Sequence, residues 1–235
     1  MQPRIWAVVP AAGAGRRMLS AIPKQYLQVA GACVLEHTLR ALLTEKRIDT
    51  VVVAISAEDE YFESLTAGRD PRVSIAPGGA ERADSVRNAL QSLVGRAEPE
   101  DLVLVHDAAR PCLARAELRA LIDAALADPV GAILALPVRD TVKRSDAHGR
   151  IAVTVPRDDL WRAQTPQAFR FEALLGALEN AGRAGVVVTD EAQAMERIGA
   201  NARLVTGSER NIKLTVAEDL ALLERYLQDM RAGGQ

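Results

Sequence analysis

The chain has 235 residues, of which 49% are hydrophobic and 26% charged, a composition that suits a globular protein with a sizeable core and excludes a disordered or fibrous one. Its formal net charge of −2 argues against a general nucleic-acid-binding surface, and it has no apolar run of about 18 residues that would cross a membrane. Its N-terminus leads directly into a predicted strand without a basic segment and apolar signal core, so we expect a cytoplasmic protein.

Buried-strand patterns alternate with helical ones along most of the chain. In the first half we predict strands at 5–9, 50–55, 73–75 and 102–105 and helices at 34–43, 58–65 and 81–93. In the second half we predict a helix over 118–126, a strand at 131–136, helices at 171–178 and 190–198, a strand at 203–205, and a last helix opened by a capping box, Thr215 to Glu218. This alternation predicts an α/β fold, with a Rossmann-like, mostly parallel sheet and helices on both of its faces.

A different pattern interrupts this alternation at about 138–157. Two short strands, 141–144 and 151–155, flank a polar turn at 146–149 and indicate a β-hairpin. An isolated two-stranded ribbon is marginally stable in water. Either it folds against its own domain or it is an arm that a second subunit covers, and we favour the arm because the domain already has its strands. We therefore predict one domain over 1–235 with a protruding hairpin arm.

An apolar run near the N-terminus ends at a proline and is followed by small residues and then by cations. The run 5–9 stops at Pro10, and Arg16, Arg17 and Lys24 follow a stretch of alanines and glycines. Small residues let backbone N–H groups approach phosphate oxygens, and the cations supply charge. The spacing fits neither a Walker A loop nor a complete dinucleotide fingerprint. It indicates a triphosphate-binding loop, the alternative being a plain turn with solvated cations.

Polar clusters follow four of the predicted strands, at 10–18, 77–85, 106–110 and 137–141. Since open α/β sheets bind ligands at the carboxyl ends of their strands, we expect one shared site there. Asp107 is the candidate Mg²⁺ ligand, the alternative being a helix or turn cap. Ser85 either hydrogen-bonds a nucleobase or faces solvent, and Lys213 either reaches the site or is solvated.

The absence of other catalytic patterns narrows the chemistry. No Ser-His-Asp, Cys-His or zinc-ligand spacing is present, and Cys33 and Cys112 are expected to be buried thiols. Nucleotidyl transfer to a phosphate needs none of these patterns, because it depends on positioning and on charge neutralisation by Lys, Arg and Mg²⁺.

Taken together, the motifs resemble the family of 2-C-methyl-D-erythritol 4-phosphate cytidylyltransferases of the non-mevalonate isoprenoid pathway. The matching segments are Pro10–Met18, Pro23–Tyr26, Gly78–Ser85, Val105–Pro111, Pro137–Arg144, Thr165–Gln167, Thr189–Ala192 and Asn211–Thr215. The resemblance implies that CTP and methylerythritol phosphate give CDP-methylerythritol and pyrophosphate, with Mg²⁺, in a homodimer whose hairpin arms embrace the partner.

The resemblance also implies roles for individual residues. The catalytic cations would be Arg17, Lys24 and Lys213. The nucleotide would be bound by Ala11, Ala12, Gly13, Gly15, Gly79, Arg82, Ser85, Ala108 and Arg110. The acceptor substrate would be bound by Asp107, Thr141, Arg157 and Thr165, with Asp107 also at the metal. One departure is Ala80, where family members often carry Asp, so that a contact near the nucleotide is either lost or supplied by Glu81.

Three alternatives remain open at this stage. A sister enzyme acting on ribitol 5-phosphate would share the CTP-binding half and differ at the acceptor. An NAD-dependent oxidoreductase would use the same architecture, although the glycine pattern is incomplete and no hydride-transfer pair is evident. A non-catalytic nucleotide sensor would need the binding loops alone.

Overall fold

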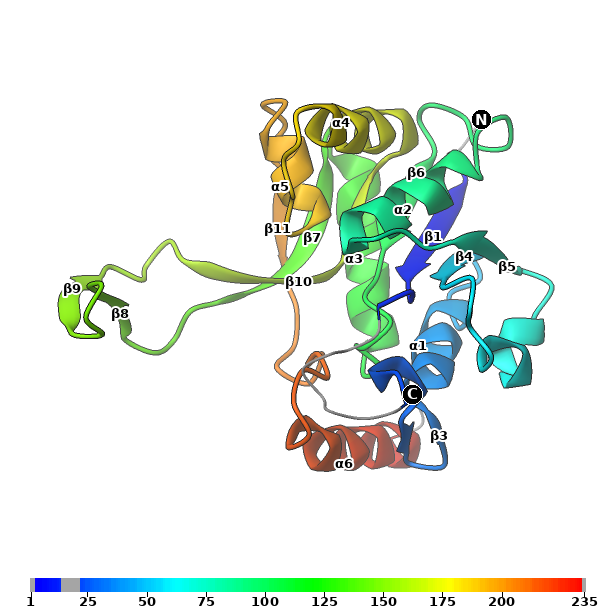
Figure 1. Ribbon diagram of the computed structural model, residues 1–235, viewed down its shortest axis with the longest axis horizontal. Coiled ribbons are helices and arrows are strands. Elements are labelled where there is room, and N and C mark those ends of the chain that lie inside the picture. Colours follow the sequence, from blue (N-terminus) through cyan, green and yellow to red (C-terminus); the bar gives the residue numbers. More distant parts are fainter. Residues whose placement is uncertain (1–2, 14–21, 234–235) are drawn as a thin grey trace.

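A seven-stranded sheet forms the centre of the computed structural model, which describes residues 3–13 and 22–233 (Figure 1). From edge to edge its strands are β11 (Arg203–Thr206), β7 (Gly131–Pro137), β10 (Trp161–Arg170), β6 (Leu102–Val105), β1 (Ile5–Pro10), β4 (Ile48–Ile55) and β5 (Val73–Pro77). Every neighbouring pair is parallel except those that β10 makes with β6 and β7. The predicted α/β fold with a mostly parallel sheet is confirmed.

Helices cover both faces of this sheet, as predicted. One face packs against α1 (Val34–Leu43) and α3 (Arg115–Ala127), and the other against α2 (Arg82–Gln91), α4 (Phe171–Arg183) and α5 (Glu191–Glu196). Because side chains alternate along a strand, Ala7 and Val9 of β1 join the first core while Trp6 and Val8 join the second. Because both faces of the strands are buried, their sequences are continuous apolar runs.

A third, smaller hydrophobic cluster lies around α6 (Asp219–Ala232), at the bottom of the view in Figure 1. It joins α6 to a short hairpin of β2 (Gln28–Val29) and β3 (Ala32–Cys33), and it contains Cys112. Both cysteines are buried free thiols, as predicted. No helix within the described ranges is long and apolar enough to cross a membrane.

The strand β10 was not predicted. It contains Gln164, Thr165, Pro166 and Gln167, and a proline in a polar run argues against a central strand because it cannot donate to the ladder. The structure accommodates it with a shift of register against β7 between Ala163 and Gln167. The polar side chains are buried and hydrogen-bonded instead of solvated, which periodicity alone cannot reveal.

One predicted helix and the predicted start of another were also wrong. Over 58–65 only a 3₁₀ turn forms, at Phe62–Ser64, because the Asp59 carboxylate accepts the backbone N–H groups of Tyr61 and Phe62 and turns the chain. The helix α6 begins at Asp219, since the Asp219 carboxylate accepts the backbone N–H of Thr215 at 2.7 Å. The predicted box between Thr215 and Glu218 does not form.

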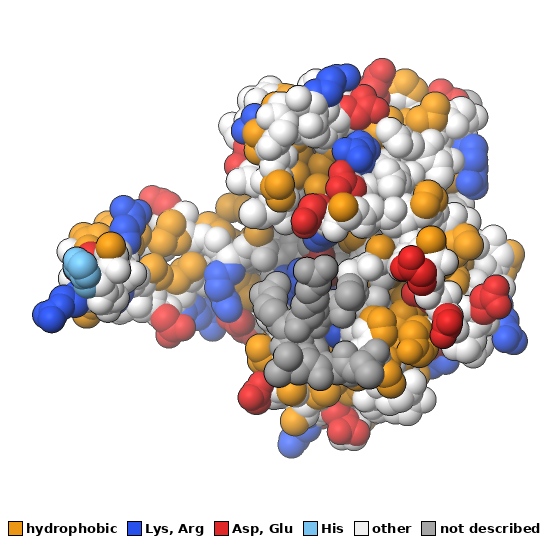
Figure 2. Space-filling model, in the orientation of Figure 1, with side chains coloured by type: hydrophobic (Ala, Val, Ile, Leu, Met, Phe, Trp, Pro, Cys, Tyr) orange, Lys and Arg blue, Asp and Glu red, His pale blue; other side chains and the backbone are white. Residues whose placement is uncertain are grey.

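The predicted hairpin is present and stands away from the sheet as an arm (Figures 1 and 2). Its strands are β8 (Val142–Ser145) and β9 (Ile151–Val155), which pair with each other in a separate two-stranded sheet. The Asp146 carboxylate accepts from two backbone N–H groups of the turn. Apolar side chains of β9 are left in solvent, Ile151 at 69% and Val153 at 47% exposure.

Candidate active site

A cavity of about 590 Å³ lies at the carboxyl ends of β1, β5 and β6. Its lining residues come from segments far apart in the sequence: Pro10, Ala11, Ala12, Gly13, Lys24, Gln25, Gly79, Ala80, Glu81, Arg82, Ser85, Asp107, Ala108, Ala109, Lys213 and Thr215. Three of the four predicted polar clusters therefore meet, and Ala80 and Glu81 both face the same space.

The fourth cluster, 137–141, contributes no lining residue within the described ranges, which corrects the expectation of one shared site. The reason is β10, which lies between β6 and β7 and so separates the end of β7 from the cavity. From Pro137 the chain continues into the arm instead.

Two glycines allow close packing beside the cavity: Gly78 lets the loops after β1 and β5 approach each other, and Gly79 lets its turn pack against the start of α2. A Cβ atom on Gly78 would lie 2.2 Å from the Cβ of Ala12, and one on Gly79 would lie 2.3 Å from the Cβ of Asp84. The Ser85 hydroxyl accepts the Gly79 N–H at 3.0 Å and donates to the Glu81 carbonyl at 3.2 Å. Ser85 is therefore buried and holds the glycine turn in place, with one lone pair remaining for a ligand.

Three cations surround the Asp107 carboxylate. Arg82 Nε lies 2.9 Å from Oδ1, while Lys213 Nζ and Arg110 Nε lie 2.9 Å and 3.3 Å from Oδ2. Burial alone would raise the pKa of Asp107, but the three positive charges outweigh burial and hold its pKa well below the usual range. Asp107 is therefore an ionised, 6% exposed carboxylate at the edge of the cavity.

Lys24 and Lys213, both predicted as catalytic cations, lie on the same cavity. Lys24 Nζ donates to the carbonyl of Leu214, the residue next to Lys213, at 2.9 Å. Gln25, which was not predicted, donates to the Ala11 carbonyl at 2.6 Å and fixes the first loop. The predicted residues Gly15, Arg16 and Arg17 lie outside the described residues.

Arg82 has a second acidic partner that sequence reasoning missed. Its Nη1 and Nη2 atoms donate to the two carboxylate oxygens of Glu191 at 2.6 Å and 3.0 Å. Burial would lower the pKa of Arg82, but Glu191 and Asp107 outweigh burial and raise it above its ordinary value. One feature of the sequence pointed to Glu191: it lies in Thr189–Ala192, one of the segments that carry the family resemblance.

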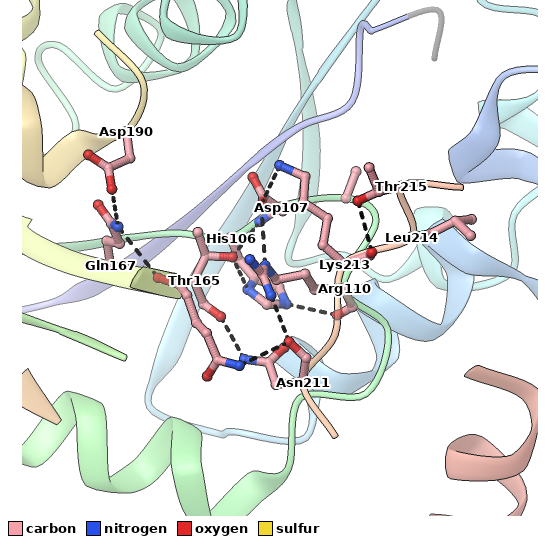
Figure 3. A network of polar contacts seen from close by, with 12 residues as sticks. His106, Asp107, Arg110, Thr165, Gln167, Asp190, Asn211, Lys213, Leu214 and Thr215 are labelled. Atoms are coloured by element: carbon pink, nitrogen blue, oxygen red, sulfur yellow. Dashed lines mark hydrogen bonds and ion pairs between the residues drawn. The ribbon is translucent and has the colours of Figure 1, made fainter. Parts of the chain in front are cut away.

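A buried network behind Asp107 includes the predicted Thr165 (Figure 3). The Thr165 hydroxyl accepts the Asp107 backbone N–H at 3.0 Å and lies 3.0 Å from His106 Nδ1. His106 Nε2 faces the Arg110 carbonyl at 3.0 Å, so Nε2 carries the proton and the Thr165 hydroxyl donates to Nδ1. Burial lowers the pKa of His106 to about 4, which keeps the ring neutral at neutral pH.

Known proteins are similar to this chain in both sequence and fold. The family model "IspD: 2-C-methyl-D-erythritol 4-phosphate cytidylyltransferase" matches residues 5–229. The chain belongs to this family. It is 52% identical over 226 residues to the Ectopseudomonas mendocina cytidylyltransferase, covering 96% of each chain. It is also 50% identical over 232 residues to the Aeromonas hydrophila cytidylyltransferase, covering 99% of this chain and 93% of that one.

Solved structures of cytidylyltransferases have the same fold as this chain. A 4-diphosphocytidyl-2C-methyl-D-erythritol synthase superposes with a TM-score of 0.83 at 39% identity, covering 97% of this chain and 99% of that one. The Francisella tularensis cytidylyltransferase superposes with a TM-score of 0.82 at 32% identity, covering 95% and 99%. The resemblance inferred from the motifs is confirmed.

Two residues to which the cytidylyltransferase resemblance assigned substrate contacts lie on the arm. Thr141 and Arg157 are both exposed and neither lines the cavity of its own chain. The Arg157 guanidinium donates to the Arg139 carbonyl at the base of the arm. The described part of one chain therefore does not bring these two residues to its own cavity.

Proposed function

We propose that the cavity binds CTP and that the enzyme transfers its cytidylyl group to 2-C-methyl-D-erythritol 4-phosphate, releasing pyrophosphate. Membership of the cytidylyltransferase family supports this reaction. The observation that carries it at the level of residues is the meeting of Lys24, Lys213 and the Asp107 cluster around a cavity lined by small residues. Since both substrates and both products are water-soluble phosphates, we expect the reaction to take place in the cytosol.

The transfer needs a displacement at one phosphorus atom. An oxygen of the acceptor phosphate attacks the α-phosphorus of CTP in line, and a new P–O bond forms. The bond from the α-phosphorus to the bridging oxygen breaks, and pyrophosphate leaves with the electron pair. Because the attacking oxygen is already anionic, no general base is required, which agrees with a site built from cations.

The residues of the cavity take distinct parts in this step. Backbone N–H groups of the loop after β1 and of the Gly79 turn bind the nucleotide, together with Ser85 and Ala108. Lys24 and Lys213 neutralise charge that builds up on the phosphates. Arg17 is assigned the same role on the resemblance alone.

Asp107 fits a Mg²⁺ ion as its single carboxylate ligand. No group of three or more acidic, His or Cys side chains suitable for a metal exists within the described ranges, and Mg²⁺ commonly uses one or two carboxylates together with substrate phosphates. Lys213 is partly exposed, so it can leave Asp107 for a phosphate oxygen when CTP binds. The bound ion would neutralise the triphosphate and polarise the attacked phosphorus.

The arm supports a homodimer of single-domain subunits. Two exposed apolar residues on β9 would be buried by a partner, and Thr141 and Arg157 are not among the described residues that line their own cavity. We propose that these two residues hold the acceptor phosphate in the partner's site, with Thr165 contributing from the opposite side.

The deciding experiment measures pyrophosphate release from CTP and Mg²⁺ with methylerythritol phosphate and, in parallel, with ribitol 5-phosphate. Release with methylerythritol phosphate alone is expected. Release with ribitol 5-phosphate alone would retain the chemistry and replace the acceptor. Tight CTP binding with no release in either case would favour a nucleotide sensor, and binding of a nicotinamide cofactor would favour an oxidoreductase.

A further inference from the structure

A buried carboxylate outside the cavity lining controls one of the three cations at Asp107. Glu191 is 1% exposed, and both of its oxygens accept from Arg82, at 2.6 Å and 3.0 Å. The remaining edge of the same guanidinium, Nε, donates to Asp107 Oδ1 at 2.9 Å. Because the guanidinium is planar and rigid, fixing two of its nitrogens on Glu191 also fixes the direction of the third.

Glu191 is itself held on the sheet. It is the first residue of α5, and the Asp190 carboxylate caps this helix by accepting the Gln193 N–H at 2.9 Å. Gln167 of β10 accepts the Ala192 N–H at 2.8 Å and donates to Asp190 at 2.9 Å, a contact visible in Figure 3. Glu191 therefore stands on an element anchored to a central strand, which suits a residue that orients others.

The two carboxylates that Arg82 contacts determine whether it orients Asp107 or attracts a phosphate. In the described part of the cluster, Arg82 is shared by two carboxylates, whereas Lys213 has Asp107 as its single ion-pair partner. Balanced in this way, Arg82 orients Asp107 and has little charge left to attract a phosphate. Without Glu191, the guanidinium would lose two of its three hydrogen bonds and would be held by its Nε contact with Asp107 alone, so its two terminal nitrogens could turn towards a bound nucleotide.

We propose that Glu191 is a positioning residue for cytidylyl transfer, holding Arg82 so that Asp107 keeps its orientation towards the bound nucleotide. The inference rests on the proposed function and adds a residue to it. Since Glu191 lies behind Arg82 and outside the cavity lining, its removal should affect turnover and leave nucleotide affinity intact or increased.

The test compares Glu191→Gln with Glu45→Gln. Glu45 is also a buried carboxylate between arginines, but its partners Arg47 and Arg119 are not among the described residues that line the cavity, whereas Arg82 is, so Glu45 controls for the loss of a buried ion pair. We expect kcat of Glu191→Gln to fall about 100-fold with no rise in KM for CTP, because small displacements of reacting groups have effects of this size. Glu45→Gln should retain wild-type turnover.

Two further variants separate positioning from folding. Glu191→Asp keeps the charge at a shorter reach and should give intermediate turnover. In the Arg82→Met background, adding Glu191→Gln should cause no further loss, because the residue through which Glu191 acts is gone. Thermal unfolding of each variant shows that the compared proteins are folded.

Equal turnover in Glu191→Gln and Glu45→Gln, or a Glu191→Gln loss that persists in the Arg82→Met background, would overturn the inference while the wild-type reaction stands. A wild-type enzyme that releases no pyrophosphate with either acceptor would instead overturn the proposed function, and this inference with it.

Discussion

Asn211 donates from its side-chain amide to the backbone carbonyl of Thr165 at 2.8 Å, joining the segment that carries Lys213 to the middle of β10. The side chain of Asn211 is fully buried, and the backbone carbonyl of Asn211 accepts from Arg110 Nη1 at 2.6 Å (Figure 3). Asn211, which lies outside the cavity lining, thus links Thr165 and Arg110 to the segment that carries Lys213. It was not predicted, because a single asparagine in a loop carries no periodic signal.

Replacing Asn211 with Ala should therefore impair both stability and turnover. Removal of the bond to Thr165 leaves a buried carbonyl without its donor, which costs about 1–3 kcal/mol of unfolding free energy. Displacement of Lys213 should lower kcat about 10- to 100-fold. Urea unfolding and pyrophosphate release measure the two effects, and Asn180→Ala, at an exposed position on α4, is the control. Wild-type turnover in Asn211→Ala would contradict the positioning argument.

Lys24→Ala should abolish most of the activity while retaining the fold. The Lys24 side chain lies at the cavity, where Nζ donates to the Leu214 carbonyl, so its removal disturbs little of the core. Removing a cation from a phosphoryl-transfer site is expected to lower kcat about 100- to 1000-fold. Pyrophosphate release gives the rate and circular dichroism gives the fold. Lys46→Ala, at an exposed position away from the cavity, should behave as wild type, and near-normal turnover in Lys24→Ala would exclude the assigned role.

Mixing two inactive variants tests whether arms serve the partner's site. Lys24→Ala disables the cavity of its own chain and Arg157→Ala disables the arm. A heterodimer of the two contains one cavity with an intact Lys24 that faces an intact arm. Partial recovery of activity on mixing is expected, to about a quarter of the wild-type rate per subunit for random exchange between dimers. Heterodimers that form, as seen by mass spectrometry, but remain inactive would rule out shared sites.

Glu45 gives a pH-dependent contribution to stability. Burial would raise the pKa of Glu45, but hydrogen bonds from Arg47 and Arg119 outweigh burial and lower it to about 2. Because the pKa in the folded state lies below that of the unfolded chain, the stabilisation is present above about pH 4.5 and is lost as the pH falls towards 2. Glu45→Gln should therefore lower the unfolding free energy by about 1.5–3 kcal/mol at neutral pH.

The difference between Glu45→Gln and wild type should shrink as the pH falls below about 4.5. Urea unfolding across this range measures it, with Glu60→Gln, at an exposed site, as the control. A difference that stays constant with pH would mean that the ion pairs of Glu45 do not supply the stabilisation.

The sequence was most informative where one local pattern determines one structure. Apolar runs identified six of the seven strands of the sheet, and the polar turn around Asp146 identified the arm. It was least informative where a residue's role depends on a distant partner. Thr165, Gln167 and their strand β10 look like a polar loop until buried hydrogen bonds from other segments satisfy them. Glu191 is an ordinary surface glutamate by composition, and it becomes a site residue only when α5 meets Arg82.

The pairing at the base of the arm bears on how this molecule could have been assembled. Pro137 of β7 lies directly opposite Trp161 of β10, and the Val138 N–H donates to the Leu160 carbonyl at 2.9 Å. The two strands are therefore already antiparallel neighbours at the point where the arm departs, so a tight turn could join them directly. The arm is in this sense an insertion at the tip of a hairpin, and an ancestral or engineered chain lacking it would keep its sheet and its nucleotide cavity while losing the proposed contact with a second subunit.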